Sequence, residues 1–138
     1  MKIRALAHGA IAAAAMLTMN LAWAAPPGSV TPAFSEPIPN IPGKSLIAVV
    51  VTYPPGGKTP PHHHAYSAFV TGYVLSGAIR SQVDGGKVQV FQAGESFSEN
   101  PGARHDVSEN ASETEPAKLL AIFVADSKET ALTTMDTK

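Results

Sequence analysis

The chain has 138 residues, a formal net charge of −1 at pH 7, 44% hydrophobic residues and no cysteine. A chain of this length has room for one domain of ordinary size, and that domain has to fold without disulfides. Ten Lys and Arg are set against eleven Asp and Glu. Because the basic residues form no cluster that could follow a phosphate backbone, nucleic acid is not an expected partner.

The first 24 residues have the three parts of a secretory signal peptide. Lys2 and Arg4 supply the positive charge, an apolar stretch runs from Ala10 to Leu17, and an Ala-Trp-Ala pattern ends at Ala24. The apolar stretch is shorter than the roughly 20 residues that a membrane span needs. We therefore expect cleavage after Ala24, a periplasmic or secreted mature protein, and no membrane segment in that mature protein.

Residues 25–43 form an arm with proline at six positions. Proline lacks an amide donor and favours an extended, polyproline-like backbone. The arm is expected to be either a flexible spacer or a segment that lies along a sheet edge of a neighbouring subunit. A homodimer is therefore one expected assembly.

Residues 44–126 contain short runs of β-branched and aromatic residues between turn signals, with no sustained apolar period of 3.6 residues. Ser76-Gly77 and Asp84-Gly85-Gly86 are typical of hairpin turns, since glycine accepts a positive φ at no steric cost. The pattern predicts an all-β sandwich or closed roll, followed by a loose polar tail or frayed helix over residues 127–138. The predicted strands are 46–53, 68–75, 78–83, 88–92, 95–99, 104–108 and 118–125. The predicted core residues are Phe69, Val74, Leu75, Ile79, Val83, Leu120, Ile122 and Val124.

Three of the four histidines that follow the signal peptide are consecutive, at His62, His63 and His64, and the fourth is His105. In an extended segment alternate side chains point to the same side, so His62 and His64 are expected to face one way and His63 the other. Two imidazoles from one strand and a third from another strand are a common way to hold zinc, iron, nickel or copper. Taken alone, the pattern is also compatible with surface histidines after a Pro-Pro loop.

The residues around these histidines resemble the two sequence motifs of the cupin superfamily. Gly56 stands at the first glycine of the first motif, His62 and His64 at its His-x-His pair, and Gly77 at its closing glycine. Gly94, Gly102 and His105 match the second motif in register. The resemblance extends over about residues 46–125 and implies the cupin double-stranded β-helix, a small jelly-roll-like barrel. It also implies that His62, His64 and His105 bind one divalent metal ion, which would be Fe, Mn, Zn, Ni or Cu.

Two positions depart from the cupin motifs. Val70 stands where the first motif has its metal-binding glutamate, and Asn100 replaces the first proline of the second motif, whose Asn comes one residue late, at Asn110. Some cupin dioxygenases resemble this chain in using iron on three histidines. The missing glutamate also leaves open a cupin that binds no metal.

Glu99 is a candidate to replace the missing carboxylate, because strand alternation places it on the same face as Glu95 and Phe97. It is the candidate catalytic residue, as a fourth ligand, a hydrogen-bond acceptor for a ligand imidazole or a general base; an exposed glutamate at a strand end is the alternative. Weaker candidates for the mouth of the barrel are Tyr66, Tyr73, Arg80, Gln82 and Arg104.

The sequence thus predicts an exported metal-binding cupin that takes a small-molecule ligand. A dioxygenase-type oxidoreductase, a non-redox enzyme and a binding or sensing module without turnover all stay open, because one fold serves many chemistries.

Overall fold

The computed structural model describes residues 26–137, so the expected signal peptide lies outside the described residues. All the secondary structure elements assigned in this range are β-strands. The described residues contain no helix that is long and apolar enough to cross a membrane. The strands are β1 (Ser29–Pro37), β2 (Lys44–Tyr53), β3 (Lys58–Thr59), β4 (His62–His64), β5 (Phe69–Ser76), β6 (Ala78–Val83), β7 (Gln89–Gln92), β8 (Ser96–Glu99), β9 (Arg104–Asn110), β10 (Ala117–Asp126) and β11 (Thr133–Met135).

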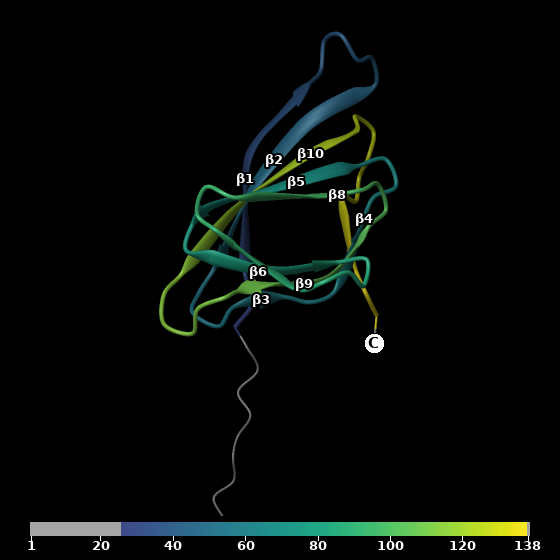
Figure 1. Ribbon diagram of the computed structural model, residues 1–138. Coiled ribbons are helices and arrows are strands. Elements are labelled where there is room, and N and C mark those ends of the chain that lie inside the picture. Colours follow the sequence, from purple (N-terminus) through teal and green to yellow (C-terminus); the bar gives the residue numbers. More distant parts are fainter. Residues whose placement is uncertain (1–25, 138) are drawn as a thin grey trace, which may run out of the picture.

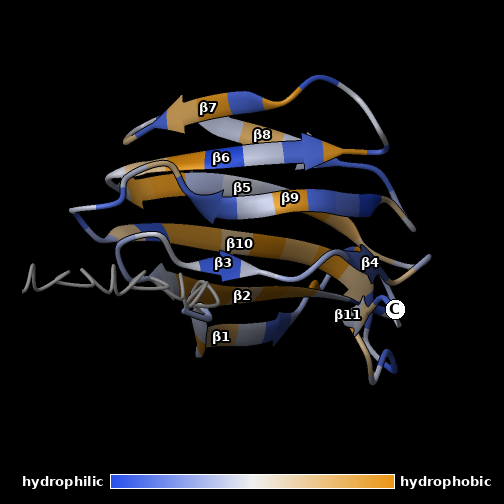
Figure 2. Cartoon of the chain, turned by 90° about the horizontal axis from the view of Figure 1, so that it is seen from below, coloured by the Kyte–Doolittle hydropathy of each residue, from blue (hydrophilic) through white to orange (hydrophobic). Residues whose placement is uncertain are grey.

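The strands form two antiparallel sheets that face each other (Figure 1). One sheet has the order β1-β2-β10-β5-β8, and the other has the order β11-β4-β9-β6-β7 with β3 paired to β9. Hydrophobic residues are concentrated on β2, β10 and β5 (Figure 2). Side chains that alternate along these strands bury one face of each sheet against the other, which is the usual basis of a two-sheet domain.

Seven of the structure's strands lie within two residues of the seven that the sequence predicts. The turn over Asp84 and Gly85 also forms as expected, with φ of 50° and 66° at these two residues. At Gly77, φ is 70° and an added Cβ would lie 2.7 Å from the Pro116 carbonyl oxygen, so this turn needs glycine for both reasons. The all-β prediction is confirmed.

The expectations for the arm and the tail differ from the structure. Within the arm, residues 29–37 form β1, which pairs with β2 of the same chain instead of acting as a spacer or joining a neighbouring subunit. Residues 133–135 form β11, which pairs with β4. Both strands are at sheet edges, where proline and polar residues are tolerated. Their composition therefore gives little indication that these segments are strands.

The prediction of which residues of β10 face the core is wrong by one position. Its most buried residues are Ala117, Leu119, Ala121, Phe123 and Ala125, whereas the predicted Leu120, Ile122 and Val124 lie on the other face and are only half-buried. Phe69 and Leu75 are exposed for the same reason, because Val70 and Val74 hold the inward positions of β5. Uniformly apolar strands carry no alternation from which the phase can be read.

Candidate metal site

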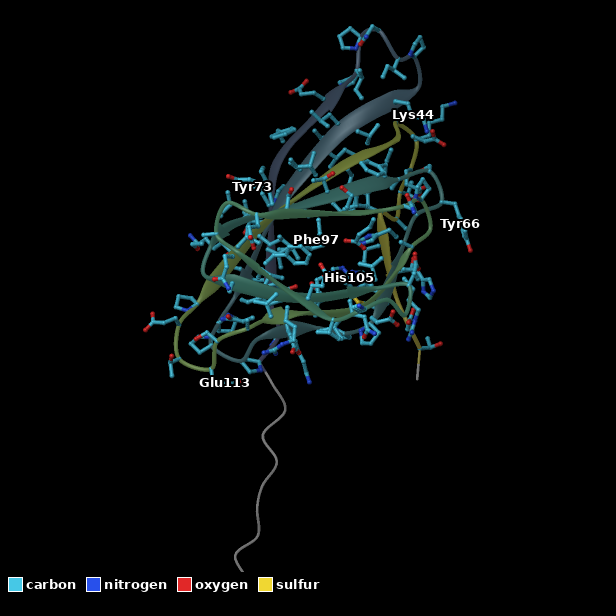
Figure 3. The ribbon with its side chains drawn as sticks, in the orientation of Figure 1. Lys44, Tyr66, Tyr73, Phe97, His105 and Glu113 are labelled. Carbon is cyan, nitrogen blue, oxygen red and sulfur yellow. The ribbon has the colours of Figure 1, made fainter. Side chains whose placement is uncertain are left out.

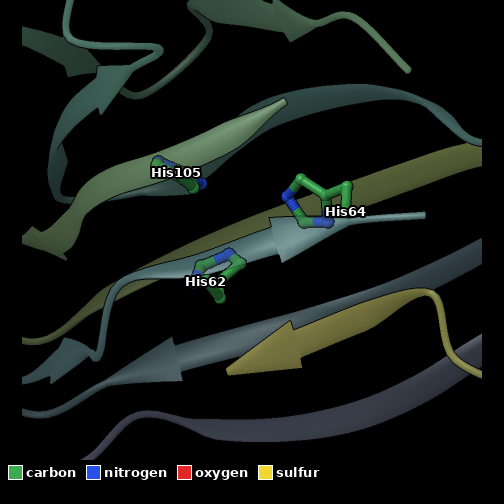
Figure 4. A group of neighbouring side chains, drawn as sticks. All are labelled: His62, His64 and His105. Atoms are coloured by element: carbon green, nitrogen blue, oxygen red, sulfur yellow. The ribbon is translucent and has the colours of Figure 1, made fainter. Parts of the chain in front are cut away.

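The inward face of β4 carries two of the three candidate histidines. His62 and His64 are 5% and 7% exposed, whereas His63 is exposed, as strand alternation predicts. His105 is on the neighbouring strand β9, directly opposite His62 in the antiparallel register, and is 3% exposed. The two strands thus bring three imidazoles to one place inside the barrel (Figure 4).

The three rings are close enough together to be candidate ligands of one ion. One nitrogen from each of His62, His64 and His105 lies within 4.8 Å of the others. The ring centroid of His62 is 5.0 Å from that of His64 and 5.1 Å from that of His105. The structure therefore contains a buried three-histidine cluster that could hold a metal ion.

Each imidazole has a hydrogen-bond partner on its outer nitrogen. His62 Nδ1 lies 2.8 Å from the Pro60 carbonyl oxygen, and His64 Nδ1 lies 3.2 Å from Thr133 Oγ1. His105 Nε2 lies 2.9 Å from Ser81 Oγ. When the outer nitrogens donate these bonds, the inner nitrogen of each neutral ring keeps a free lone pair, which is the state that binds metal. Burial lowers the pKa of His62, although its bond to Pro60 opposes the shift, and so favours the neutral ring.

Glu99 is the fourth group at the site. It is 3% exposed, on β8 directly opposite Val70 of β5. Its Oε2 lies 3.1 Å from His64 Nε2, and its Oε1 lies 3.3 Å from His105 Nδ1. Burial raises the pKa of the Glu99 carboxyl, but His105 and His64 together outweigh burial and bring that pKa to about 2. The carboxylate is therefore ionised at neutral pH.

These contacts fit a cation between the groups. His64 Nε2 and Glu99 Oε2 are both buried and neither has a hydrogen bond of acceptable geometry, despite their 3.1 Å separation. Two ligand atoms that are each about 2.1 Å from one ion are about 3.0 to 3.4 Å apart at octahedral or tetrahedral angles. Three nitrogens and one carboxylate oxygen suit borderline divalent metals. The donor set, and the spacing of His64 and Glu99, therefore fit the metal ion that the histidine pattern implies.

A cavity of about 260 Å³ is lined by all four groups. The rest of its wall is mainly aliphatic, from β2, β5, β10 and the C-terminal segment, and includes Val70, Ala121 and Leu132. Val30 and Met135 line it and are 62% and 51% exposed, so they stand at its open side. A small molecule in this cavity would contact the cluster directly.

The weaker sequence candidates do not line this cavity. Tyr66 projects away from the barrel and is 89% exposed (Figure 3). Arg104 lies on the exposed side of β9, where it pairs with Asp106 and Asp136. Arg80 pairs with Glu109, so these guanidinium groups already have carboxylate partners outside the cavity. The remaining candidates that lie outside the cavity lining are Tyr73 and Gln82.

Phe97 and Glu99 both point inward, as their shared face predicts. The Phe97 ring centroid lies 5.8 Å from that of His105, and Figure 3 shows both residues between the sheets. Glu95, placed on the same face by the sequence, is exposed, and its carboxylate accepts a hydrogen bond from the Gln92 amide in the turn before β8. Alternation fails at Glu95 because β8 begins only at Ser96.

Sequence reasoning missed the groups that orient the imidazoles. Ser81 is buried on β6, and Thr133 comes from the segment expected to be a loose tail. Asn110, singled out only as a displaced motif residue, is 2% exposed and donates hydrogen bonds to the carbonyl oxygens of Pro54 and Glu115. These roles depend on contacts between distant segments, for which the sequence has no local signal.

Two facing antiparallel sheets around an internal histidine cluster define a double-stranded β-helix protein. The sequence model of the cupin domain matches residues 49–123, more than half of the chain. The chain belongs to the cupin family. A comparison with curated proteins finds no match.

Solved structures share this fold. A double-stranded β-helix protein from Klebsiella pneumoniae is 19% identical with a TM-score of 0.62, covering 80% of this chain and 85% of its own. The DMSP lyase DddQ from Ruegeria pomeroyi is 21% identical with a TM-score of 0.55, covering 65% of this chain and 42% of its own. An oxalate oxidase is 23% identical with a TM-score of 0.56, covering 78% and 54%. The chain thus spans about half the length of these two enzymes.

Proposed function

We propose that this protein is an exported metal-dependent enzyme in which His62, His64, His105 and Glu99 bind one divalent ion and the adjoining cavity binds a small-molecule substrate. The observation that carries the proposal is a cluster of three buried imidazoles with the buried Glu99 carboxylate 3.1 Å from His64 and 3.3 Å from His105. The reaction class that we favour is a dioxygenase-type oxidation. Enzymes among the proteins of similar fold, a DMSP lyase and an oxalate oxidase, support catalysis over passive binding.

The protein residues supply charge and orientation at this site. Three neutral imidazoles and one carboxylate leave a divalent ion with a single net positive charge, so the site attracts one further anionic or polar oxygen. When bound, a redox-active metal with free positions would activate oxygen or polarise a substrate oxygen. The buried position of Glu99 and the mainly aliphatic cavity wall lower the local dielectric constant, which strengthens electrostatic interactions at the site.

The cross-strand pair of Val70 and Glu99 explains how the motif glutamate is replaced. The carboxylate comes from β8 instead of from position 70 on β5, and directly paired residues on one face of a sheet have Cβ atoms about 5 Å apart. We expect Glu99→Val to weaken metal binding by roughly tenfold or more, because the site loses its only anionic ligand. Val70→Glu with Glu99→Val should recover most of this loss. Metal affinity of the three proteins, measured by competition with a chelator dye, checks the prediction.

The matched control for this exchange is Val70→Gln with Glu99→Val, which has nearly the same shape as the rescued protein but no charge. It should bind metal as weakly as Glu99→Val alone. If Glu99→Val bound metal as tightly as the unaltered protein, Glu99 would act as an acceptor or base and not as a ligand.

Export is the part of the proposal that rests on the first 24 residues alone. We expect the mature protein to begin at Ala25 when the full chain is produced in a bacterial host, because the Ala-Trp-Ala pattern suits signal peptidase. Intact mass and N-terminal sequencing of the exported fraction measure this. Exported protein that still starts at Met1 would contradict it.

A non-catalytic binding module is the second candidate, and one observation favours it. Glu99 lies within 3.3 Å of both His64 and His105, so protonated imidazoles could neutralise the carboxylate without any metal. Metal analysis of protein recovered from its own compartment, followed by oxygen-uptake measurements with a panel of small molecules, separates the two candidates. Bound metal with substrate-dependent oxygen consumption supports the dioxygenase, and metal-free protein that still binds small molecules supports the module.

A further inference from the structure

The cavity beside the three histidines is lined mainly by apolar side chains. Its wall includes eight aliphatic or aromatic side chains that contain only carbon and hydrogen, together with Met135. Among the residues that the structure describes, no lysine, arginine, aspartate, asparagine or glutamine lines it. The charged or titratable side chains in the lining are Tyr53, Glu99 and the three histidines. A bound metal would engage Glu99 and all three histidines.

The hydroxyl groups in the wall are already paired with one another or with a ligand imidazole. Tyr53 Oη lies 2.8 Å from both Thr59 Oγ1 and Ser108 Oγ. Thr133 Oγ1 lies 3.2 Å from His64 Nδ1. These bonds reduce what the hydroxyls can offer to a charged ligand. A second charged group on a substrate would find no opposite charge in the wall.

We propose that the substrate is a small, mainly apolar molecule with one oxygen donor for the metal and no second charged group, such as a phenol, enol or ketone. This inference rests on the proposed function for the oxygen donor, but the apolar selectivity belongs to the cavity itself. A cavity of about 260 Å³ exceeds the roughly 150 Å³ that encloses benzene in an engineered protein. It therefore accommodates one ring with several substituents.

Burying an unpaired carboxylate in such a wall is far more costly than burying a methyl group, which gains from apolar contact. The matched probes are p-cresol and p-hydroxybenzoate, which share the phenolic oxygen and the ring and differ in a methyl or carboxylate at the far end. We expect p-cresol to bind at least about tenfold more tightly. Ligand-observed NMR titration at pH 7.5 of the zinc-free protein, in which the carboxylate has no metal to bind, measures both affinities.

Val30→Lys is the control variant, because Val30 lines the cavity at its open side and is exposed enough to tolerate lysine. The added ammonium should shift the ratio of the two affinities several-fold in favour of p-hydroxybenzoate. Equal or tighter binding of p-hydroxybenzoate by the unaltered protein, or no p-cresol binding at millimolar concentration, would overturn the proposal. Zinc binding by a separate sample of the same protein separates the two claims: protein that prefers p-cresol but binds no zinc keeps the cavity inference and rejects the metal enzyme.

Discussion

Replacing His62, His64 or His105 by alanine should weaken metal binding by more than about 100-fold. Even groups that only orient a metal ligand cost about 10- to 100-fold when removed, and each of these imidazoles would be a ligand itself. One ring nitrogen of each lies within 4.8 Å of the others, so each of the three replacements removes a ligand from the same site. Equilibrium dialysis with metal analysis measures the change.

His63→Ala is the internal control, since His63 lies between two of the proposed ligands and has the same chemistry. Its Nδ1 lies 2.5 Å from Asp136 Oδ1 on the outside of the barrel. Metal affinity should stay within a few-fold of that of the unaltered protein. An equal loss in His63→Ala would mean that the metal binds on the outer face or that β4 is not extended in solution.

The second large effect is a metal-dependent gain in thermal stability that fades in mild acid. A metal that binds only the folded protein adds about 2.7 kcal/mol when the free ion is a hundredfold above its Kd, which raises Tm by roughly 10 °C for a domain of this size. Protons compete for the same imidazoles. The gain should be full at pH 7.5 and much smaller at pH 5.5, as differential scanning fluorimetry with and without zinc would show.

The direction in which stability changes with pH follows from the pKa values of the titrating groups. Free imidazole has a pKa of about 6.5, and burial lowers the pKa of His62 in the folded protein. As pH falls below about 6.5 the unfolded chain takes up the proton first, so the metal-free fold also loses stability. The pKa of Glu99, about 2, keeps its carboxylate ionised throughout this range, and its contribution is lost only as pH falls below about 4.5. A zinc-dependent gain that is undiminished at pH 5.5 would point to carboxylate ligands in place of histidines.

Some of this architecture could be predicted from the sequence because it depends on local rules. Alternation along an extended segment places His62 and His64 inward and His63 outward, and the structure confirms these positions. The same rule correctly places Glu99 beside Phe97 on the inward face of β8. Turn glycines mark the hairpins between the predicted strands.

Other features depend on contacts between distant segments. The sequence identifies Val70 as the residue at the lost glutamate position, but only the antiparallel register of β5 and β8 places Glu99 opposite it. The C-terminal segment has the composition of a tail, yet Thr133 approaches His64 and Leu132 lines the cavity. Edge strands gain their stability from pairing, and pairing partners are not encoded in local composition.

A crystal structure of the zinc- or manganese-loaded protein with anomalous data tests the central claim most directly. We predict one anomalous peak inside the barrel, about 2.0 to 2.3 Å from a ring nitrogen of His62, His64 and His105 and from a carboxylate oxygen of Glu99. A loaded crystal with no peak among these residues, or with its main peak at His63 and Asp136 on the outer face, would contradict the account.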